Sequence, residues 1–248
     1  IFSLEDLVNR DYNIVIGRKG SGKTATFYAL EEHLNQSSIN HVCQIQPVVF
    51  EIDGLLFSLE NLPESYEQTY VVESIWKLLI YTEIISSLYE RIKRKHLAAY
   101  TEIEKKFVNF VELNSDVFQQ DLCRRIAKEL SDIKPIVEDR VLDFSVKVSE
   151  LIHEGTLSRA KDMLGELFQK ERDKRIVVLI DNLDQSWEKG KKIELQTKWI
   201  LGLLNVARRI VTDLSKVRIK ESQKTIGFNL TIFLRSDIFK YVRERYPE

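Results

Sequence analysis

The stretch Asn13-Ile14-Val15-Ile16-Gly17-Arg18-Lys19-Gly20-Ser21-Gly22-Lys23-Thr24 decides the fold of this chain. Its first part, Asn13 to Gly17, is a short apolar, β-branched run closed by glycine, which is typical of a buried strand in a parallel sheet. From Gly17 to Thr24 the sequence matches G-x-x-x-x-G-K-[ST] at every fixed position. The pattern from Gly22 to Leu34 is helical. A strand, a glycine-rich loop and a helix in this order predict a phosphate-binding loop.

The chemistry of such a loop follows from its backbone. Glycines let successive N–H groups point into one concavity, and the helix that follows adds the partial positive charge of its N-terminus. A triphosphate fits there: Lys23 is expected to reach the β- and γ-phosphates, and the Thr24 hydroxyl to ligate Mg²⁺. The residues expected to bind ATP are Gly17, Arg18, Lys19, Gly20, Ser21, Gly22, Lys23, Thr24 and Ala25.

The composition excludes several other classes of protein. The 248 residues include 37 Lys and Arg against 38 Asp and Glu, so the chain is not a wholly basic nucleic-acid-binding protein. Hydrophobic residues make up 44% of the chain and charged residues 30%, which is enough apolar side chain for a packed core. With 9 glycines and 4 prolines, few residues punctuate turns, and long helices are favoured.

The cellular compartment is predicted from two further features. Cys43 and Cys123 lie far apart, without the spacing of a disulfide framework or a zinc site, which fits a reduced cytoplasm. No apolar run approaches the length of a membrane span, and residues 1–6 lack the regions of a signal peptide. We therefore expect a cytoplasmic protein without a membrane partner.

Three more strands and a helical block complete the expected organisation. Gln46–Gly54, Arg175–Asp181 and Leu230–Arg235 read as strands, the last two as central ones. Between them, residues 194–214 carry the spacing of a helix that covers a sheet face. From about residue 61 to 172 the chain is helical in pattern and too long for a simple crossover, so we expect an all-helical insertion beside the sheet.

Two carboxylates follow the apolar run that ends at Asp181. An apolar strand that ends in Asp places its carboxylate at the carboxyl edge of the sheet, where open α/β sheets bind ligands, so Asp181 can complete the Mg²⁺ site opposite Thr24. Asp184, three residues on, is the candidate for orienting or deprotonating the attacking water.

Arg235 follows another predicted central strand and precedes Ser236-Asp237. An arginine at that edge can contact a γ-phosphate, because its planar guanidinium donates two parallel hydrogen bonds. A solvated arginine, or one paired with Asp237, explains the same residues equally well.

The succession GRKGSGKT, VVLIDNLDQSW and IFLRSDIF resembles the AAA+-related P-loop ATPases of the STAND and origin-recognition type, particularly bacterial multidomain ATPases, some of which act in anti-phage defence. The resemblance spans residues 13–237. It implies an α/β P-loop NTPase fold, a parallel sheet flanked by helices, in a single domain whose core is residues 1–60 and 173–248. The insertion of about 61–172 would lie between the second strand and the Walker B strand.

The resemblance also implies roles for individual residues. Gly17 to Thr24 are Walker A, Asp181 and Asp184 lie in a Walker B of the D-x-x-D form, and Arg235 is at the sensor 1 position. Asn182 departs from ordinary AAA+ proteins, which place a glutamate directly after the Walker B aspartate. Slow, switch-like hydrolysis is therefore expected, with Asp184, Lys23 and Arg235 as the catalytic residues.

The ends of the chain suggest a piece of a longer protein. It begins without Met and stops at Tyr246-Pro247-Glu248. A C-terminal lid, sensor 2 and further effector domains are expected outside it, with ATP and ADP as ligands and a homo-oligomer or attached domains as partners.

Other features have simpler explanations. The basic clusters at residues 91–96 and 216–220 could meet nucleic acid, but solvated surface accounts for most such runs. Arg208 or Arg209 could be an arginine finger, although surface charge is the more common role. The tryptophans are expected in the core, and the four histidines form no cluster.

Two rival functions remain open. A P-loop kinase would use the same cradle for phosphate transfer, although it normally carries a short arginine-rich lid instead of a large helical block. A non-hydrolysing interaction module would hold the nucleotide as a structural ligand and dock a partner on the helices.

Overall fold

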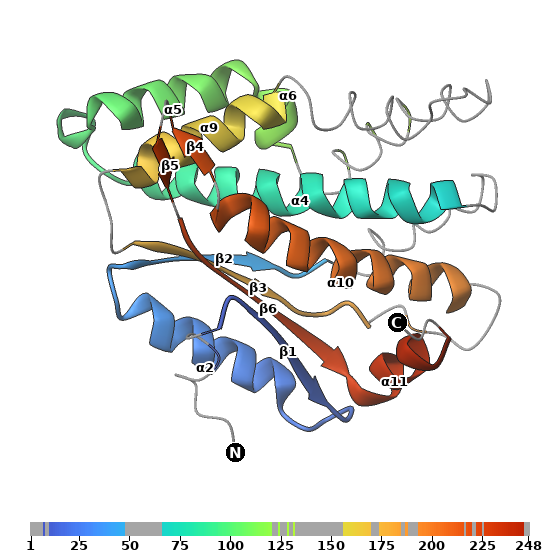
Figure 1. Ribbon diagram of the computed structural model, residues 1–248. Coiled ribbons are helices and arrows are strands. Elements are labelled where there is room, and N and C mark those ends of the chain that lie inside the picture. The colour runs from blue at the N-terminus through green and yellow to red at the C-terminus, as the bar shows by residue number, and fades with distance from the viewer. Residues whose placement is uncertain are drawn as a thin grey trace.

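A computed structural model (Figure 1) describes residues 7, 10–47, 66–120, 124, 128, 131, 156–169, 174–184, 187, 193–215, 217–219, 222–224 and 226–245. Its centre is a four-stranded parallel sheet in the order β1-β6-β3-β2. The strands are β1 (Tyr12–Gly17), β2 (Asn40–Ile45), β3 (Arg175–Ile180) and β6 (Gly227–Arg235). The chain is therefore an α/β protein with a parallel sheet flanked by helices.

Helices cover both faces of this sheet (Figure 1). Helix α2 (Lys23–Asn35) lies on one face, and α4 (Tyr66–Lys93) and α10 (Ile193–Ser215) lie on the other. Because successive side chains of a strand point to opposite faces, β3 supplies Val177 and Leu179 to the α2 side, and its alternate residues to the α4 and α10 side. Burial on both faces explains the continuous apolar run Ile176–Ile180 of β3 and the predominance of apolar residues in β6.

Helices α4 and α10 approach each other closely. The Trp76 and Trp199 rings stack with centroids 4.1 Å apart, and Trp76 Nε1 donates to the Trp199 carbonyl at 2.9 Å. A Cβ on Gly202 would lie 2.5 Å from Val72 Cγ1, so glycine permits this contact. The prediction that both tryptophans are core residues is confirmed.

More helices pack on the side of α4 away from the sheet (Figure 1). They are the short 3₁₀ helix η1 (Leu97–Ala99), α5 (Glu102–Leu113), α6 (Ser115–Phe118) and α9 (Thr156–Gln169). Thr101 and Glu104 form a capping box at the start of α5, which fixes where that helix begins. The described residues between 66 and 172 contain helices and no strand, as expected.

The second strand lies earlier in the chain than predicted. The expected strand Gln46–Gly54 is wrong at Gln46 and Pro47, which belong to no strand, and its remainder lies outside the described residues. Strand β2, Asn40–Ile45, pairs with β3 in register from Asn40↔Arg175 to Ile45↔Ile180. Polar Asn40, His41 and Gln44 interrupt its apolar pattern, which explains why the sequence did not reveal it.

The remaining elements follow the predicted central helix. Strands β4 (Val217–Ile219) and β5 (Ser222–Lys224) pair as an antiparallel hairpin that the sequence analysis did not predict. The chain then enters β6, and α11 (Ser236–Arg245) begins directly after it. No helix in the described part of the chain combines the length and apolarity that crossing a bilayer requires.

Candidate phosphate-binding site

The predicted site residues lie at the carboxyl edge of the sheet. Gly17 ends β1, Arg18 to Gly22 form the connection, and Lys23, Thr24 and Ala25 are the first residues of α2. Asp181 and Asp184 follow β3, and Arg235 ends β6. Since β6 lies between β1 and β3, the parallel topology brings these three strand ends to one edge.

The loop between β1 and α2 depends on its glycines. Gly20 and Gly22 have φ of +78° and +85°, in the left-handed region that residues with a Cβ rarely adopt. At Gly17 a Cβ would lie 2.3 Å from Ser21 Oγ, and the Ser21 N–H donates to the Arg18 carbonyl at 3.1 Å. The positive φ of Gly20 and Gly22 therefore favours glycine at both positions, and the absence of a side chain at Gly17 leaves room for the Ser21 side chain.

The loop leads into the N-terminus of a helix that suits an anion. The first turn of α2 has no acidic residue, so nothing on the helix itself neutralises its partial positive charge. Lys23 Nζ donates to the Arg18 carbonyl at 3.2 Å, which folds the side chain back across the loop. The residues Arg18, Lys19, Gly20, Ser21 and Gly22 are exposed, so the loop is open to a ligand from solvent.

Asp181 links the second motif to the first. Its residue is 3% exposed, and its N–H continues the ladder by donating to the Ile45 carbonyl at 3.1 Å. Burial raises the pKa of the Asp181 carboxyl, and the Asp184 charge adds to that rise, whereas hydrogen bonds from the Asn182 N–H and the Thr24 hydroxyl oppose it. The Thr24 hydroxyl therefore lies close enough to the Asp181 carboxylate to lower its pKa, although the two residues are far apart in sequence.

The same carboxylate retains an unused oxygen. Asp181 Oδ2 is buried and has no hydrogen-bond partner. A buried carboxylate oxygen beside a threonine hydroxyl fits Mg²⁺, which prefers oxygen ligands and takes few of them from the protein when phosphates and waters supply the others. Across the described residues no group of three or more His, Cys, Asp and Glu side chains could enclose a metal, so Mg²⁺ would need ligands from a bound phosphate.

Asn182 has a local structural role. Its φ is +65°, and it is the one residue other than glycine with positive φ in the described part of the chain. Asparagine tolerates the left-handed region far better than most residues. The departure from the AAA+ glutamate at this position therefore coincides with a backbone conformation that favours asparagine.

Arg235 lies between two carboxylates. Its Nε and NH2 atoms donate to the Asp237 oxygens at 3.1 and 2.7 Å, and its Nε is 3.6 Å from Asp184 Oδ2. The bond from Asp237 raises the pKa of Arg235, and the same bond lowers the pKa of Asp237. In the strand register Arg235 is opposite Gly17, next to the entry of the phosphate loop. Both the ion pair with Asp237 and the proximity to the predicted phosphate site are present.

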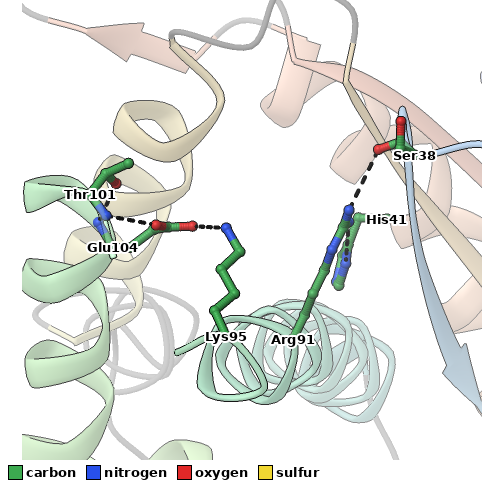
Figure 2. Close-up of polar contacts among 6 residues, drawn as sticks. All are labelled: Ser38, His41, Arg91, Lys95, Thr101 and Glu104. Atoms are coloured by element: carbon green, nitrogen blue, oxygen red, sulfur yellow. Dashed lines mark hydrogen bonds and ion pairs between the residues drawn. The ribbon is translucent and has the colours of Figure 1, made fainter. Parts of the chain in front are cut away.

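The first basic cluster is largely occupied by contacts within the protein (Figure 2). Arg91 NH1 donates to the Asn40 carbonyl at 3.3 Å and lies 3.4 Å from His41 Nδ1, and its NH2 donates to the Ser38 carbonyl at 3.5 Å. Burial, followed by the charge of Arg91, lowers the pKa of His41 to about 3, so this histidine is neutral in the folded protein. Arg91 thus helps to hold the end of α4 on strand β2.

Two lysines of this cluster are paired with glutamates. Lys95 Nζ lies 2.5 Å from Glu104 Oε1 (Figure 2), and Lys93 Nζ lies 3.1 Å from Glu112 Oε1. These pairs leave less positive charge available for nucleic acid than the sequence alone suggested. The second cluster overlaps strand β4, and its side chains lie outside the described residues.

A cavity of about 400 Å³ lies at the end of α4, away from the phosphate loop. Its wall contains Leu88, Ile92 and Phe168. The charged residues that line it are Arg91, Lys95, Lys174, Glu102 and Glu104. Because cations and carboxylates nearly balance, the lining does not select a ligand of one charge.

The structure also places the other candidates. Arg209 NH1 lies 2.7 Å from Glu73 Oε2, so this arginine joins α10 to α4. Trp187 packs edge-on against Tyr241 of α11 with centroids 5.8 Å apart, which supports its expected packing role.

Comparison with known proteins adds little to this geometry. The chain is 24% identical over 241 residues to the "Putative transposon gamma-delta 80.3 kDa protein" of Escherichia coli (strain K12). The match covers 96% of this chain and 31% of that protein, so the chain spans less than a third of that relative's length. No family model matches the chain, and no solved structure matches it.

Proposed function

We propose that this chain is a P-loop ATPase domain of the AAA+/STAND type, which binds MgATP at the β1–α2 loop and hydrolyses it slowly. The proximity of the Thr24 hydroxyl to the Asp181 carboxylate, which has a buried oxygen without a hydrogen-bond partner, is the observation that carries the proposal. A hydroxyl at a helix N-terminus and a carboxylate from another strand meet where a phosphate-bound cation would lie.

Each residue has a role in the proposed reaction. Lys23 exchanges the Arg18 carbonyl for the β- and γ-phosphates, and the loop N–H groups hold the phosphate oxygens. Thr24 and Asp181 would hold Mg²⁺, which neutralises charge on the phosphates. Asp184 orients or deprotonates the attacking water, and Arg235 donates to the γ-phosphate.

The proposal extends to the architecture of the domain. Residues 1–60 and 173–248 would form the P-loop core, and the helices α4, α5, α6 and α9 would belong to the insertion of about 61–172 between β2 and β3. Arg235 ends β6, which lies between β1, the strand before the loop, and β3, the strand before Asp181. This position supports the assignment of Arg235 as sensor 1. We also propose that nucleotide state is coupled to attached domains or neighbouring subunits, and that the protein acts in phage defence. Both proposals depend on the resemblance of the three motifs.

Binding measurements on matched variants test the proposal. MgATP and MgADP affinities are to be measured by titration calorimetry for the wild type, Lys23→Ala and Lys106→Ala, the last being an exposed lysine of α5 outside the loop. We expect Lys23→Ala to weaken ATP binding by at least tenfold and Lys106→Ala to have little effect. Wild-type affinity in Lys23→Ala would refute the assignment.

Turnover separates the rival functions. Phosphate release from ATP in water, lost in Asp184→Asn, supports hydrolysis. Transfer of the γ-phosphate to an added acceptor would indicate a kinase, and tight ATP retention without turnover would indicate a nucleotide-stabilised interaction module.

A further inference from the structure

Arg235 is held by a residue that the reaction does not need. Its guanidinium forms a two-bond pair with Asp237, the second residue of α11, and only a longer contact with Asp184. Two parallel N–H···O bonds are the geometry that arginine also uses for phosphate. Asp237 therefore occupies the donors that a γ-phosphate would require.

Helix α11, which carries Asp237, is packed against the rest of the domain, so we expect an exchange of partners to occur by side-chain movement. Ile238 and Val242 of α11 are buried, and Arg245 NH1 bonds Glu194 Oε1 of α10 at 2.7 Å. The Asp237 side chain itself is 59% exposed, whereas that of Arg235 is 20% exposed. Figure 1 shows α11 beginning at the same end of the sheet as the β1–α2 loop.

We infer that Asp237 is a positioning residue that competes with the γ-phosphate for Arg235 and so sets the preference of the site for ATP over ADP. The inference rests on the proposed function. With ADP, Arg235 keeps its pair with Asp237. With ATP, Arg235 leaves Asp237 for the γ-phosphate, and the loss of the pair weakens ATP binding alone.

The size of the effect follows from the exposure of the pair. Exposed ion pairs contribute about 0.2–1 kcal/mol, which corresponds to at most about a fivefold change in affinity. Removing the Asp237 charge should therefore tighten ATP binding about two- to fivefold and leave ADP binding unchanged. It should also have no effect once Arg235 is absent.

A double-mutant cycle tests this inference. MgADP and the slowly hydrolysed analogue Mg·AMP-PNP are to be titrated into the wild type, Asp237→Asn, Arg235→Ala and the double variant. We expect Asp237→Asn to raise the AMP-PNP to ADP affinity ratio in the wild-type background and not in the Arg235→Ala background. Asp237→Ser, which keeps a side chain suited to a helix N-terminus, should behave as Asp237→Asn does.

The possible failures are distinguishable. An equal gain with and without Arg235 would mean that Asp237 acts only as a nearby negative charge, and an unchanged ratio in both Asp237 variants would mean that the pair does not compete with phosphate. Either result overturns the inference while leaving the nucleotide site intact. Failure of the wild type to bind either nucleotide would instead overturn the proposed function.

Discussion

Asp181→Asn should be more stable than the wild type in the absence of nucleotide and less stable than the wild type in the presence of MgATP. The wild-type carboxylate is 3% exposed and has one oxygen without a hydrogen-bond partner. A buried polar group that lacks a partner costs about 1–3 kcal/mol. Asparagine keeps the volume and can accept the Thr24 and Asn182 hydrogen bonds through its carbonyl oxygen, but its amide group would lack a partner in turn. We therefore expect Asp181→Asn to be more stable than the wild type by about 1 kcal/mol, which is the lower limit of that range.

Magnesium nucleotide should change the sign of this difference. A ligand present at about 100 times its dissociation constant stabilises the native state by about 2.7 kcal/mol. The wild type should gain this amount from MgATP, whereas Asp181→Asn, which lacks the carboxylate for the cation, should gain much less. The variant should therefore be the more stable protein without nucleotide, and the wild type with it.

The assay is urea unfolding followed by tryptophan fluorescence, with EDTA in one series and MgATP in the other. For a chain of this size, a change of about 1 kcal/mol corresponds to about 2–4 °C in Tm, so thermal unfolding offers a second measurement. Asp162→Asn is the matched control, because Asp162 is an exposed residue of α9 outside the site. A variant less stable than the wild type in EDTA, or equally stabilised by MgATP, would refute the reasoning.

Three further predictions concern the fold. Because the pKa of His41 falls from 6.5 to about 3 on folding, the unfolded chain takes up a proton before the folded chain as the pH drops, and about 2 kcal/mol of the free energy of unfolding should be lost between pH 7.5 and pH 5. In urea unfolding, His41→Gln should lack this loss, and the exposed control His33→Gln should keep it. The same dependence of the free energy of unfolding on pH in His41→Gln and the wild type would disprove the prediction. Gly202→Ala should destabilise the protein by about 1 kcal/mol, because overpacking against Val72 costs about 1–3 kcal/mol and exceeds the helix-propensity gain of about 1 kcal/mol. Adding Val72→Ala to this variant should restore stability in a denaturant titration, and the absence of this rescue would count against the contact. Thr101→Ala should cost about 1 kcal/mol by removing the α5 cap, whereas Thr101→Ser should not, and equal melting temperatures for the two variants would contradict the capping role.

The strongly patterned elements were predictable because their local signals agree with their tertiary environment. Helix α10 extends one residue beyond each end of the predicted 194–214, and β3 and β6 lie within or around the predicted apolar runs. Strand β2 was not predictable, because its polar residues find partners only in the folded chain. The Asn40 amide donates to the Leu34 carbonyl, and its side-chain oxygen accepts from Arg175 Nε at 2.7 Å.

The sequence by itself determined the residue types of the candidate site, because a glycine-rich phosphate loop has fixed spacing within one short segment. Only the tertiary structure decided which of those residues meet. Parallel pairing of β1, β6 and β3 brings Thr24 to Asp181 and Arg235 to Asp184, although more than 150 residues separate the first pair. Contacts between segments so distant depend on strand order and register, which are set by burial over the whole sheet and not by any local pattern.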